Sequence, residues 1–526
     1  MANTYVMAID AGTGSVRAVI FDESGSQTGV SQREWTHSED PRFPGSMDFD
    51  WTTNWGLVCT CIKEVLTKTG VAPAQIAAVS TTCMREGIVL YDGAGNEIWA
   101  CANVDARSNT EVGELKKISG DLEKEIYLKS GQTFALGALP RLLWVKNKLP
   151  EVYQKTVKVG MFNDWLIYRL SGGNSGGVLA VEPSNGSTTG IFDLKKRNWD
   201  RDIARRCNIR DDIFPEVAEC GTIAAKISKK GAAESGLTEG IPLVVGGGDA
   251  QLGCVGVGVV NVNEAAVFGG SFWQYEFNTG TGKTSPKCDV RVNCHAIENS
   301  WQYEALAFNP GLVMRWYRDA FCQEEKRAAE ARHTDPYAIM DKEAMKIPAG
   351  SYGMYCSFSD VMNYIAWRHA APSFLNFDLS AEKFNKYTFY RAILENACMV
   401  TLGHLRLVEE ATGNRPSKVV FGGGAAKSAL WPQILSDVLG IPVEIPVVKE
   451  ATALGAALLA GKGIGLYPDI RETAKKLTKI EKTFTPDQKN AEIYAGSWET
   501  WREVYGAQLA LSDKKLTRYM WCAPGL

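Results

Sequence analysis

The feature that most constrains the fold is a strand–turn–strand segment near the start of the chain. The apolar run Val6–Ile9 leads into a turn of small residues, Asp10–Ser15, and a second apolar run follows at Val16–Phe21. This pattern predicts a β-hairpin rather than a strand followed by a helix. A weaker copy occupies residues 265–277, where Gly269-Gly270-Ser271 forms the turn. Two such hairpins, about 255 residues apart, indicate two related halves.

The length and the order of the predicted elements favour two large domains. The chain has 526 residues, and domains of about 150 residues are common. Strand-like and helix-like segments alternate, as at Ile76–Ser80 and Leu142–Asn147, which predicts an α/β protein with buried mixed sheets. Residues 385–411 and 431–439 predict two further helices, and the Lys-rich segment 471–482 predicts a solvated helix. We place the domain boundary between residues 1–259 and 260–526.

Composition excludes several classes of protein. The net charge of −3 and the pI near 6.1 argue against a non-specific nucleic-acid binder, which usually carries a basic surplus. The longest strongly apolar stretch, Ala453–Ala460, is far shorter than a membrane span, and the start lacks the basic residues of a signal peptide. The 13 cysteines form no CxxC pair or Cys/His cluster, which argues against a zinc site. We therefore expect a cytoplasmic protein without nucleic-acid or membrane partners.

The first hairpin turn has the composition of a phosphate site. The small residues of Asp10–Ser15 allow backbone N–H groups and hydroxyls to approach phosphate oxygens. Asp10, at the end of the first strand, has a carboxylate that can hold hydrated Mg²⁺. The alternative is an ordinary hairpin with a Gly/Ser tip.

A second candidate site lies in the middle of the chain. A predicted strand, Ile241–Val245, leads into a predicted glycine turn, Gly246-Gly247-Gly248, followed by Asp249. Asp249 can cap the helix that follows. The glycines favour a ligand site, because they open space beside a carboxylate that can take a proton from a hydroxyl attacking a phosphate.

A third glycine run predicts a nucleotide contact. The strand Val419–Phe421 precedes Gly422-Gly423-Gly424, and a helix begins near Trp431. A plain turn between strand and helix is the alternative. The segment Gly280–Thr284 lacks the first glycine of a P-loop, and no GxGxxG motif is present, which disfavours a nicotinamide-dependent oxidoreductase.

These three segments, in this order, resemble the FGGY carbohydrate kinases of the actin-like ATPase superfamily. Further matching segments are Met84–Gly87, Asp105–Arg107, Pro310–Trp316 and Glu450–Gly455. Within the family, the chain is most similar to the autoinducer-2 kinase branch, through Cys101–Arg107, Phe272–Gln274 and Ile445–Glu450. The resemblance implies an α/β fold of two actin-like (ribonuclease H-like) ATPase domains, with a cleft between them for ATP and a small acceptor.

The resemblance also implies roles for individual residues. Asp249 would be the general base on the acceptor hydroxyl, and Asp10 and Asp249 would lie at the Mg²⁺. The acceptor contacts would be Arg85, Glu86, Asn103, Asp105, Asp249 and Gln251. The ATP contacts would be Thr13, Gly269, Gly270, Ser271, Gly311, Gly423, Gly424 and Lys427.

Two departures from the family pattern bear on the acceptor. Asn103 stands where many members have Trp, and Leu136 stands where glycerol kinases have Tyr. Both fit a short acceptor such as open-chain 4,5-dihydroxypentane-2,3-dione, the form of autoinducer-2 that such kinases phosphorylate at C5. The resemblance further implies a regulatory contact with the phosphocarrier protein HPr. The alternatives are a pentulose or gluconate kinase, and an actin- or chaperone-like ATPase module.

Overall fold

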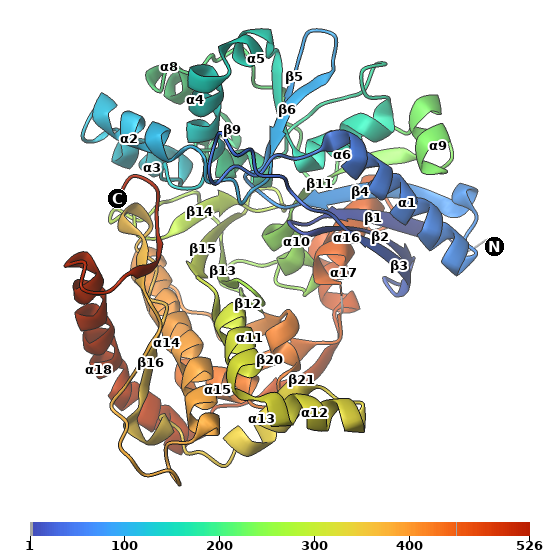
Figure 1. Ribbon diagram of the computed structural model, residues 1–526. Coiled ribbons are helices and arrows are strands. Elements are labelled where there is room, and N and C mark those ends of the chain that lie inside the picture. Colours follow the sequence, from blue (N-terminus) through green and yellow to red (C-terminus); the bar gives the residue numbers. More distant parts are fainter. Residues whose placement is uncertain (1–3, 449) are drawn as a thin grey trace.

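The computed structural model describes residues 4–448 and 450–526, and its described part contains two large β-sheets with helices packed on them (Figure 1). The first sheet consists of β10 (Ile223–Lys226), β11 (Pro242–Gly248), β4 (Ile76–Cys83), β1 (Tyr5–Ala11), β2 (Ser15–Asp22) and β3 (Gln27–Glu34), in that order. The second consists of β14 (Arg291–Cys294), β15 (Trp301–Ala307), β13 (Trp273–Thr279), β12 (Ala265–Gly269), β19 (Val419–Gly422), β20 (Val443–Pro446) and β21 (Ile480–Phe484). This architecture confirms the predicted mixed α/β fold.

The two sheets share one topology. In the first, β1 pairs antiparallel with β2 and parallel with β4, which is also parallel to β11. In the second, β12 pairs antiparallel with β13 and parallel with β19, which is also parallel to β20. Both predicted hairpins, β1–β2 and β12–β13, therefore occupy equivalent places, and the two halves are related as the sequence indicates.

Helices from both ends of the chain cover the first sheet. One face packs against α1 (Trp51–Thr69) and α6 (Phe162–Ser171). The opposite face packs against α10 (Asp249–Gly256) and α16 (Ala451–Gly463), with α17 (Ile470–Leu477) beside them. The segment from α16 to α17 thus returns from the second half of the chain to the first sheet. The predicted boundary at residue 259 stays a prediction.

The second sheet packs against its own helices, chiefly α11 (Pro310–Phe321), α14 (Lys386–Thr412) and α15 (Trp431–Leu439). The side chain of Asn385 caps α14, and Gly413, with φ of 73°, ends it. The remaining helices of eight or more residues are α2 (Asn109–Ile118), α3 (Leu122–Ser130), α4 (Ala138–Lys148), α12 (Gln323–Arg332), α13 (Pro336–Ala344) and α18 (Gln488–Asp513). Across the described ranges, no helix combines the length and the apolar character needed to cross a membrane.

Two local predictions are wrong. The glycines Gly246–Gly248 continue strand β11 and do not form a turn. Glycine is needed at position 246 because a Cβ there would overlap the carbonyl oxygen of Thr81 on the neighbouring strand. The Lys-rich segment ends its helix at Leu477, and Ile480–Phe484 forms β21. This strand lies at the edge of the second sheet, where exposed charged residues are common and obscure the strand pattern.

Candidate active site

Three parallel strands of the first sheet end at one edge and carry three predicted site residues. Asp10 lies near the end of β1, Arg85 follows β4, and Asp249 follows β11. Both β1 and β11 are parallel to β4. Ligands of open α/β sheets bind beyond the carboxyl ends of the strands. This sheet edge is therefore where we look for the reacting groups.

The predicted nucleotide turns of the second sheet lie directly against one another. A Cβ at Gly311 would lie 2.0 Å from the carbonyl oxygen of Gly270. A Cβ at Gly423, whose φ is 86°, would lie 2.5 Å from the carbonyl oxygen of Gly269. A side chain at either position would push the turns apart, so glycine is needed for this close backbone approach.

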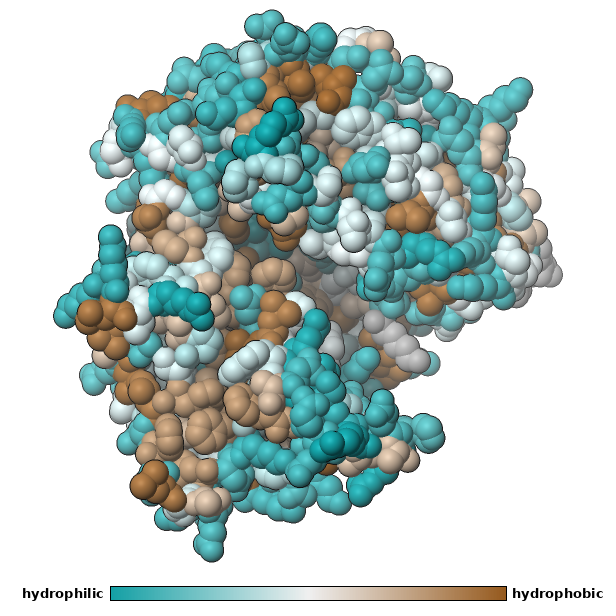
Figure 2. All heavy atoms as spheres, in the orientation of Figure 1, coloured by the Kyte–Doolittle hydropathy of each residue, from teal (hydrophilic) through white to brown (hydrophobic). Residues whose placement is uncertain are grey.

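The same turns expose groups that can contact a nucleotide. Gly270, Ser271, Gly424 and Lys427 are exposed. Figure 2 shows a hollow between the two halves of the molecule, on the side that faces the viewer. Thr13 is half-buried in the hairpin turn of the first sheet. Two glycine-rich turns from one sheet and a hydroxyl-bearing turn from the other suit a phosphate chain.

Asp10 lies in a concentration of negative charge. Its carboxylate is 3.3 Å from the guanidinium of Arg17, which also lies 3.8 Å from Glu450. Burial raises the pKa of Asp10 to about 6 against the lowering effect of Arg17, and the nearby carboxylates of Asp249 and Glu450 raise it further. A cation at this position would relieve the unfavourable charge.

The oxygen ligands at this place fit a hydrated Mg²⁺. The described ranges hold no group of three or more His, Cys, Asp or Glu side chains arranged for a metal ion. Mg²⁺ in phosphoryl-transfer sites keeps several waters and binds one or two carboxylates together with the substrate phosphates. Asp10 and Asp249, which interact electrostatically, match that donor set.

Asp249 is the first residue of α10 and does not cap it. The capping position is Gly248, and the Oδ1 atom of Asp249 accepts hydrogen bonds from the backbone N–H of Ala250 at 2.8 Å and from Nε of Arg85 at 3.1 Å. A Cβ at Gly248 would lie 2.7 Å from Oε1 of Gln251 and 2.8 Å from the Arg85 side chain, so this glycine makes room for both side chains. The Asp249 side chain remains 39% exposed. Burial raises its pKa and Arg85 opposes that effect.

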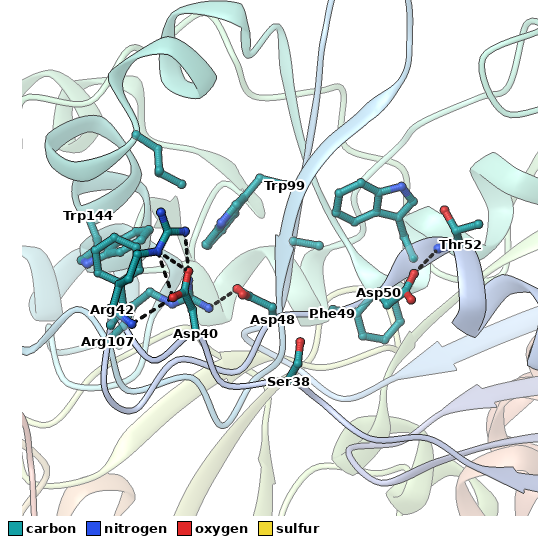
Figure 3. Close-up of a pocket in the computed structure, with 14 residues that line it drawn as sticks. Ser38, Asp40, Arg42, Asp48, Phe49, Asp50, Thr52, Trp99, Arg107 and Trp144 are labelled. Carbon is teal, nitrogen blue, oxygen red and sulfur yellow. Dashed lines mark hydrogen bonds and ion pairs between the residues drawn. The ribbon is translucent and has the colours of Figure 1, made fainter.

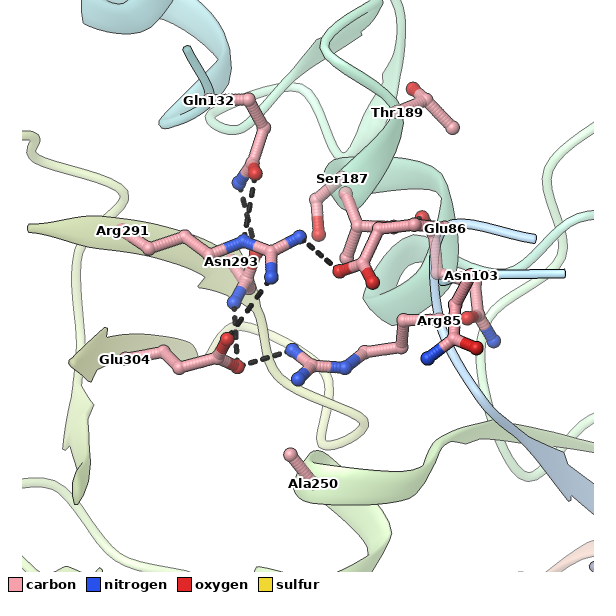
Figure 4. Close-up of polar contacts among 12 residues, drawn as sticks. Arg85, Glu86, Asn103, Gln132, Ser187, Thr189, Ala250, Arg291, Asn293 and Glu304 are labelled. Carbon is pink, nitrogen blue, oxygen red and sulfur yellow. Dashed lines mark hydrogen bonds and ion pairs between the residues drawn. The ribbon is translucent and has the colours of Figure 1, made fainter. Parts of the chain in front are cut away.

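Arg85 and Glu86 form ion pairs with residues of the second sheet (Figure 4). Arg85 donates to Glu304 on β15, and Arg291 on β14 donates to Glu86. Arg291 also donates to Glu304 at 3.1 Å. Sequence reasoning missed Arg291 and Glu304. The available signal was the regular alternation of polar and apolar residues along residues 291–294 and 301–305, which marks one polar face of a strand.

Two predicted acceptor residues have buried oxygens that accept no hydrogen bond within the described chain. Nδ2 of Asn103 donates to the Thr13 hydroxyl at 3.0 Å, but Oδ1 has no partner. Nε2 of Gln251 donates to Gln302 at 3.0 Å, but Oε1 has no partner. Buried polar atoms normally have partners, so both oxygens are available to accept hydrogen bonds from ligand hydroxyls.

Asp105 has a different environment. Its carboxylate accepts hydrogen bonds from the backbone N–H of Met47 and from Nε of Arg107, both at 2.7 Å. Arg107 in turn lies 4.9 Å above the Trp144 ring in the wall of a cavity of about 390 Å³ (Figure 3). Trp99 and Asp48 also line this cavity, and Asp48 is paired with Arg107. Within the described chain, the Asp105 carboxylate thus accepts its hydrogen bonds from other residues of the protein, Met47 and Arg107.

Comparisons with known proteins agree with this architecture. The N- and C-terminal domain models of the FGGY family of carbohydrate kinases match residues 5–256 and 279–464. The chain is 49% identical over 524 residues to a protein named autoinducer-2 kinase from Enterobacter sp. (strain 638), covering 99% of this chain and 98% of that protein. Xylulose kinase from Rhodospirillum rubrum has a similar structure, with a TM-score of 0.84, 20% identity, and 96% and 99% of the two chains covered. Gluconate kinase from Lactobacillus acidophilus matches with a TM-score of 0.84 and 20% identity, over 98% and 100% of the two chains.

Proposed function

The chain belongs to the FGGY family of carbohydrate kinases, ATP-dependent phosphotransferases with an alcohol acceptor, and we propose that its acceptor is autoinducer-2. The phosphate would go to the C5 hydroxyl of open-chain 4,5-dihydroxypentane-2,3-dione. The observation that carries this proposal is identity of 48–49%, over nearly the full length, with several proteins named autoinducer-2 kinase. The two family departures, Asn103 and Leu136, suit an acceptor that is not a sugar ring.

Asp249 is the proposed general base. Its carboxylate is partly exposed at the sheet edge, and Arg85 donates a hydrogen bond to one of its oxygens. An attacking hydroxyl is a poor nucleophile until its proton is accepted, and a carboxylate within hydrogen-bond reach can accept it. Burial raises the pKa of Asp249, which makes its carboxylate a better proton acceptor than that of an ordinary aspartate.

The acceptor is proposed to lie between Asp249 and the two unpartnered oxygens. Asn103 Oδ1 and Gln251 Oε1 accept from its hydroxyls, and the guanidinium of Arg85 donates to its carbonyls. The carboxylate of Asp105 is engaged by the backbone N–H of Met47 and by Arg107. Its proposed contribution is therefore to hold the loop that carries Asn103.

ATP is proposed to bind between the two sheets, with its phosphates beside Thr13 and Gly269–Ser271. Gly311, Gly423, Gly424 and Lys427 would line its adenosine side. Asp10 would hold a hydrated Mg²⁺ with Asp249 nearby. When bound, that ion would neutralise part of the phosphate charge. The contact with HPr and the cytoplasmic location stay predictions from the family resemblance.

A phosphotransfer screen tests the proposed acceptor. Purified protein is incubated with ATP, Mg²⁺ and one acceptor at a time, and the products are identified by mass spectrometry. The acceptors are 4,5-dihydroxypentane-2,3-dione, a pentulose, gluconate and glycerol. We expect the dione to give a monophosphate at C5 with the highest kcat/KM. A faster reaction with a sugar would overturn the acceptor, and ADP release unaffected by every acceptor would favour an ATPase module.

A further inference from the structure

The inner strands of the second sheet present a buried face of polar side chains. We name as the polar face Asn278 on β13, Arg291 and Asn293 on β14, and Gln302 and Glu304 on β15. All five are at most 2% exposed. The side chains between them, such as Val292 and Tyr303, point the other way into the apolar core of the second half. The polar side of an alternating strand normally faces water. Because these side chains are buried instead, another part of the protein must cover this face.

The cover is the acceptor end of the first half. Glu304 accepts from Arg85, Arg291 donates to Glu86, and Gln302 accepts from Gln251. Gln132, on the loop after α3, also donates to Asn293 at 2.9 Å. Three of the residues assigned to the acceptor are thus held by side chains that belong to the other sheet.

Glu304 is at the centre of these contacts. Its Oε2 accepts from Arg85 and from Asn293, and its Oε1 accepts from Arg291. Arg85 also bonds Asp249, and Arg291 also bonds Glu86. One carboxylate therefore fixes two guanidinium groups (Figure 4). Each guanidinium in turn fixes a carboxylate of the acceptor site. Buried ion pairs add little net stability in many proteins, because the cost of desolvating the charges offsets their attraction.

We propose that Glu304, with Arg291, is a positioning residue that sets the acceptor-binding geometry of Arg85, Glu86 and Asp249 from the opposite sheet. The proposal rests on the proposed function only in assigning those three residues to the acceptor. It makes acceptor recognition depend on these contacts from the second sheet, whereas the hydrogen-bond partners of Glu304 and Arg291 among the described residues include none that is assigned to ATP. A substitution of Glu304 or Arg291 would then weaken acceptor binding although neither side chain is assigned to the acceptor.

The test variant is Glu304→Gln. Gln keeps the shape, but its amide nitrogen cannot accept a hydrogen bond, so either Arg85 or Arg291 loses its hydrogen bond to residue 304. Loss of a hydrogen bond to a charged group predicts a rise in acceptor KM of about tenfold or more, with the KM for ATP within about twofold. Glu304→Asp, which keeps the charge, should recover part of that loss. The assay uses whichever acceptor proves best in the screen, so a wrong acceptor assignment does not prevent the measurement.

Glu276→Gln is the matched control. Glu276 lies directly opposite Glu304 on β13, is equally buried, and accepts no hydrogen bond from the described residues. Burial raises the pKa of Glu276 well above its ordinary value. Gln keeps the size of this side chain and removes no hydrogen bond that the described residues make to it. We expect both KM values of this variant to remain at the wild-type level.

Two outcomes would overturn the proposal. One is an unchanged acceptor KM in a folded Glu304→Gln variant, and the other is an equal rise in the KM for acceptor and for ATP. If Glu304→Gln does not fold, Arg291→Lys tests the same proposal. Lys keeps the positive charge but lacks the planar guanidinium that bonds Glu86 and Glu304 at once. If the Glu304→Gln variant phosphorylates the dione without a difference between its effects on the two KM values, this inference is wrong and the proposed function still stands.

Discussion

At the scale of single residues, the proposed chemistry depends most on Asp249. Asp249→Asn keeps the size and the hydrogen bond that Arg85 donates, but it cannot accept the proton of the attacking hydroxyl. General-base losses predict a fall in kcat of about 10²–10⁴-fold. Nucleotide affinity should persist, because the glycine turns lie on the other sheet. Turnover above about a tenth of wild type, in a folded variant, is incompatible with this role.

We expect the Asp10 carboxylate to be needed for activity but to lower the stability of the folded protein at pH 7. Its pKa of about 6 in the folded protein exceeds its ordinary value of 3.8. The folded state therefore binds this proton more tightly than the unfolded state, and stability from this group falls as pH rises from about 4 to about 6. Asp10→Asn avoids the cost of a buried charge, worth at most about 3 kcal/mol at pH 7. We expect a higher Tm at pH 7 in Mg²⁺-free buffer, together with greatly reduced turnover.

The pH dependence supplies the control for Asp10. Near pH 4 the native carboxyl is largely protonated, so the Tm difference between Asp10→Asn and wild type should shrink there. A variant that is less stable than wild type at pH 7 would show that Asp10 is held by Arg17 more strongly than it is destabilised by burial.

Residues at strand ends could be predicted from the sequence, but their partners could not. Asp10 and Asp249 follow apolar runs that mark strands, and small residues surround them. Arg291 and Glu304 are ordinary members of alternating strands. Their importance arises only because β14 and β15 meet Arg85 and Glu86, which lie about 200 residues earlier in the chain. No local pattern encodes that contact.

At the scale of elements, the contact between α11 and the Gly269–Ser271 turn is tightest at Gly311. Gly311→Ala would drive a Cβ into a backbone carbonyl that cannot rotate away. The start of α11 and the turn must then separate, and overpacking of this kind costs about 1–3 kcal/mol. We expect the KM for ATP to rise about tenfold, with the acceptor KM little changed.

Gly506→Ala controls for the substitution itself. Gly506 lies within α18, and a Cβ there would meet nothing within 4 Å. Alanine should stabilise that helix slightly and leave both KM values unchanged. If Gly311→Ala behaves in the same way, the turn is not held by α11.

The element boundaries also show where sequence patterns succeed and fail. Helix α14 was predictable because a capping Asn385 and a terminal Gly413 bracket an apolar stripe. Strand β11 was predicted too short, because three glycines in succession are typical of a turn. Here they admit close neighbours, Thr81 beside Gly246 and Arg85 beside Gly248, and only the tertiary structure reveals that need.

At the scale of the whole molecule, the acceptor end of the cleft is already fastened while the nucleotide turns are exposed. The contacts of the polar face with Arg85, Glu86 and Gln251 join the two halves at that end. We expect ATP-analogue and acceptor together to close the nucleotide end about this fixed point, because closure excludes water that would otherwise accept the phosphate.

Small-angle scattering measures this closure. The radius of gyration should fall when both ligands are bound, and acceptor alone should have a smaller effect. An unchanged radius at saturating concentrations of both would indicate a cleft that is rigid at both ends.

The return of α16 and α17 to the first sheet has a consequence for how the protein is made. The face of that sheet formed by residues such as Val6, Ala8 and Val244 is covered partly by Ala453–Ala460. During synthesis this covering segment leaves the ribosome about 200 residues after the last parallel strand of the sheet, β11. The first half therefore waits with an uncovered apolar surface while most of the second half is translated. Nascent chains in that interval are the ones most exposed to aggregation and most in need of chaperones.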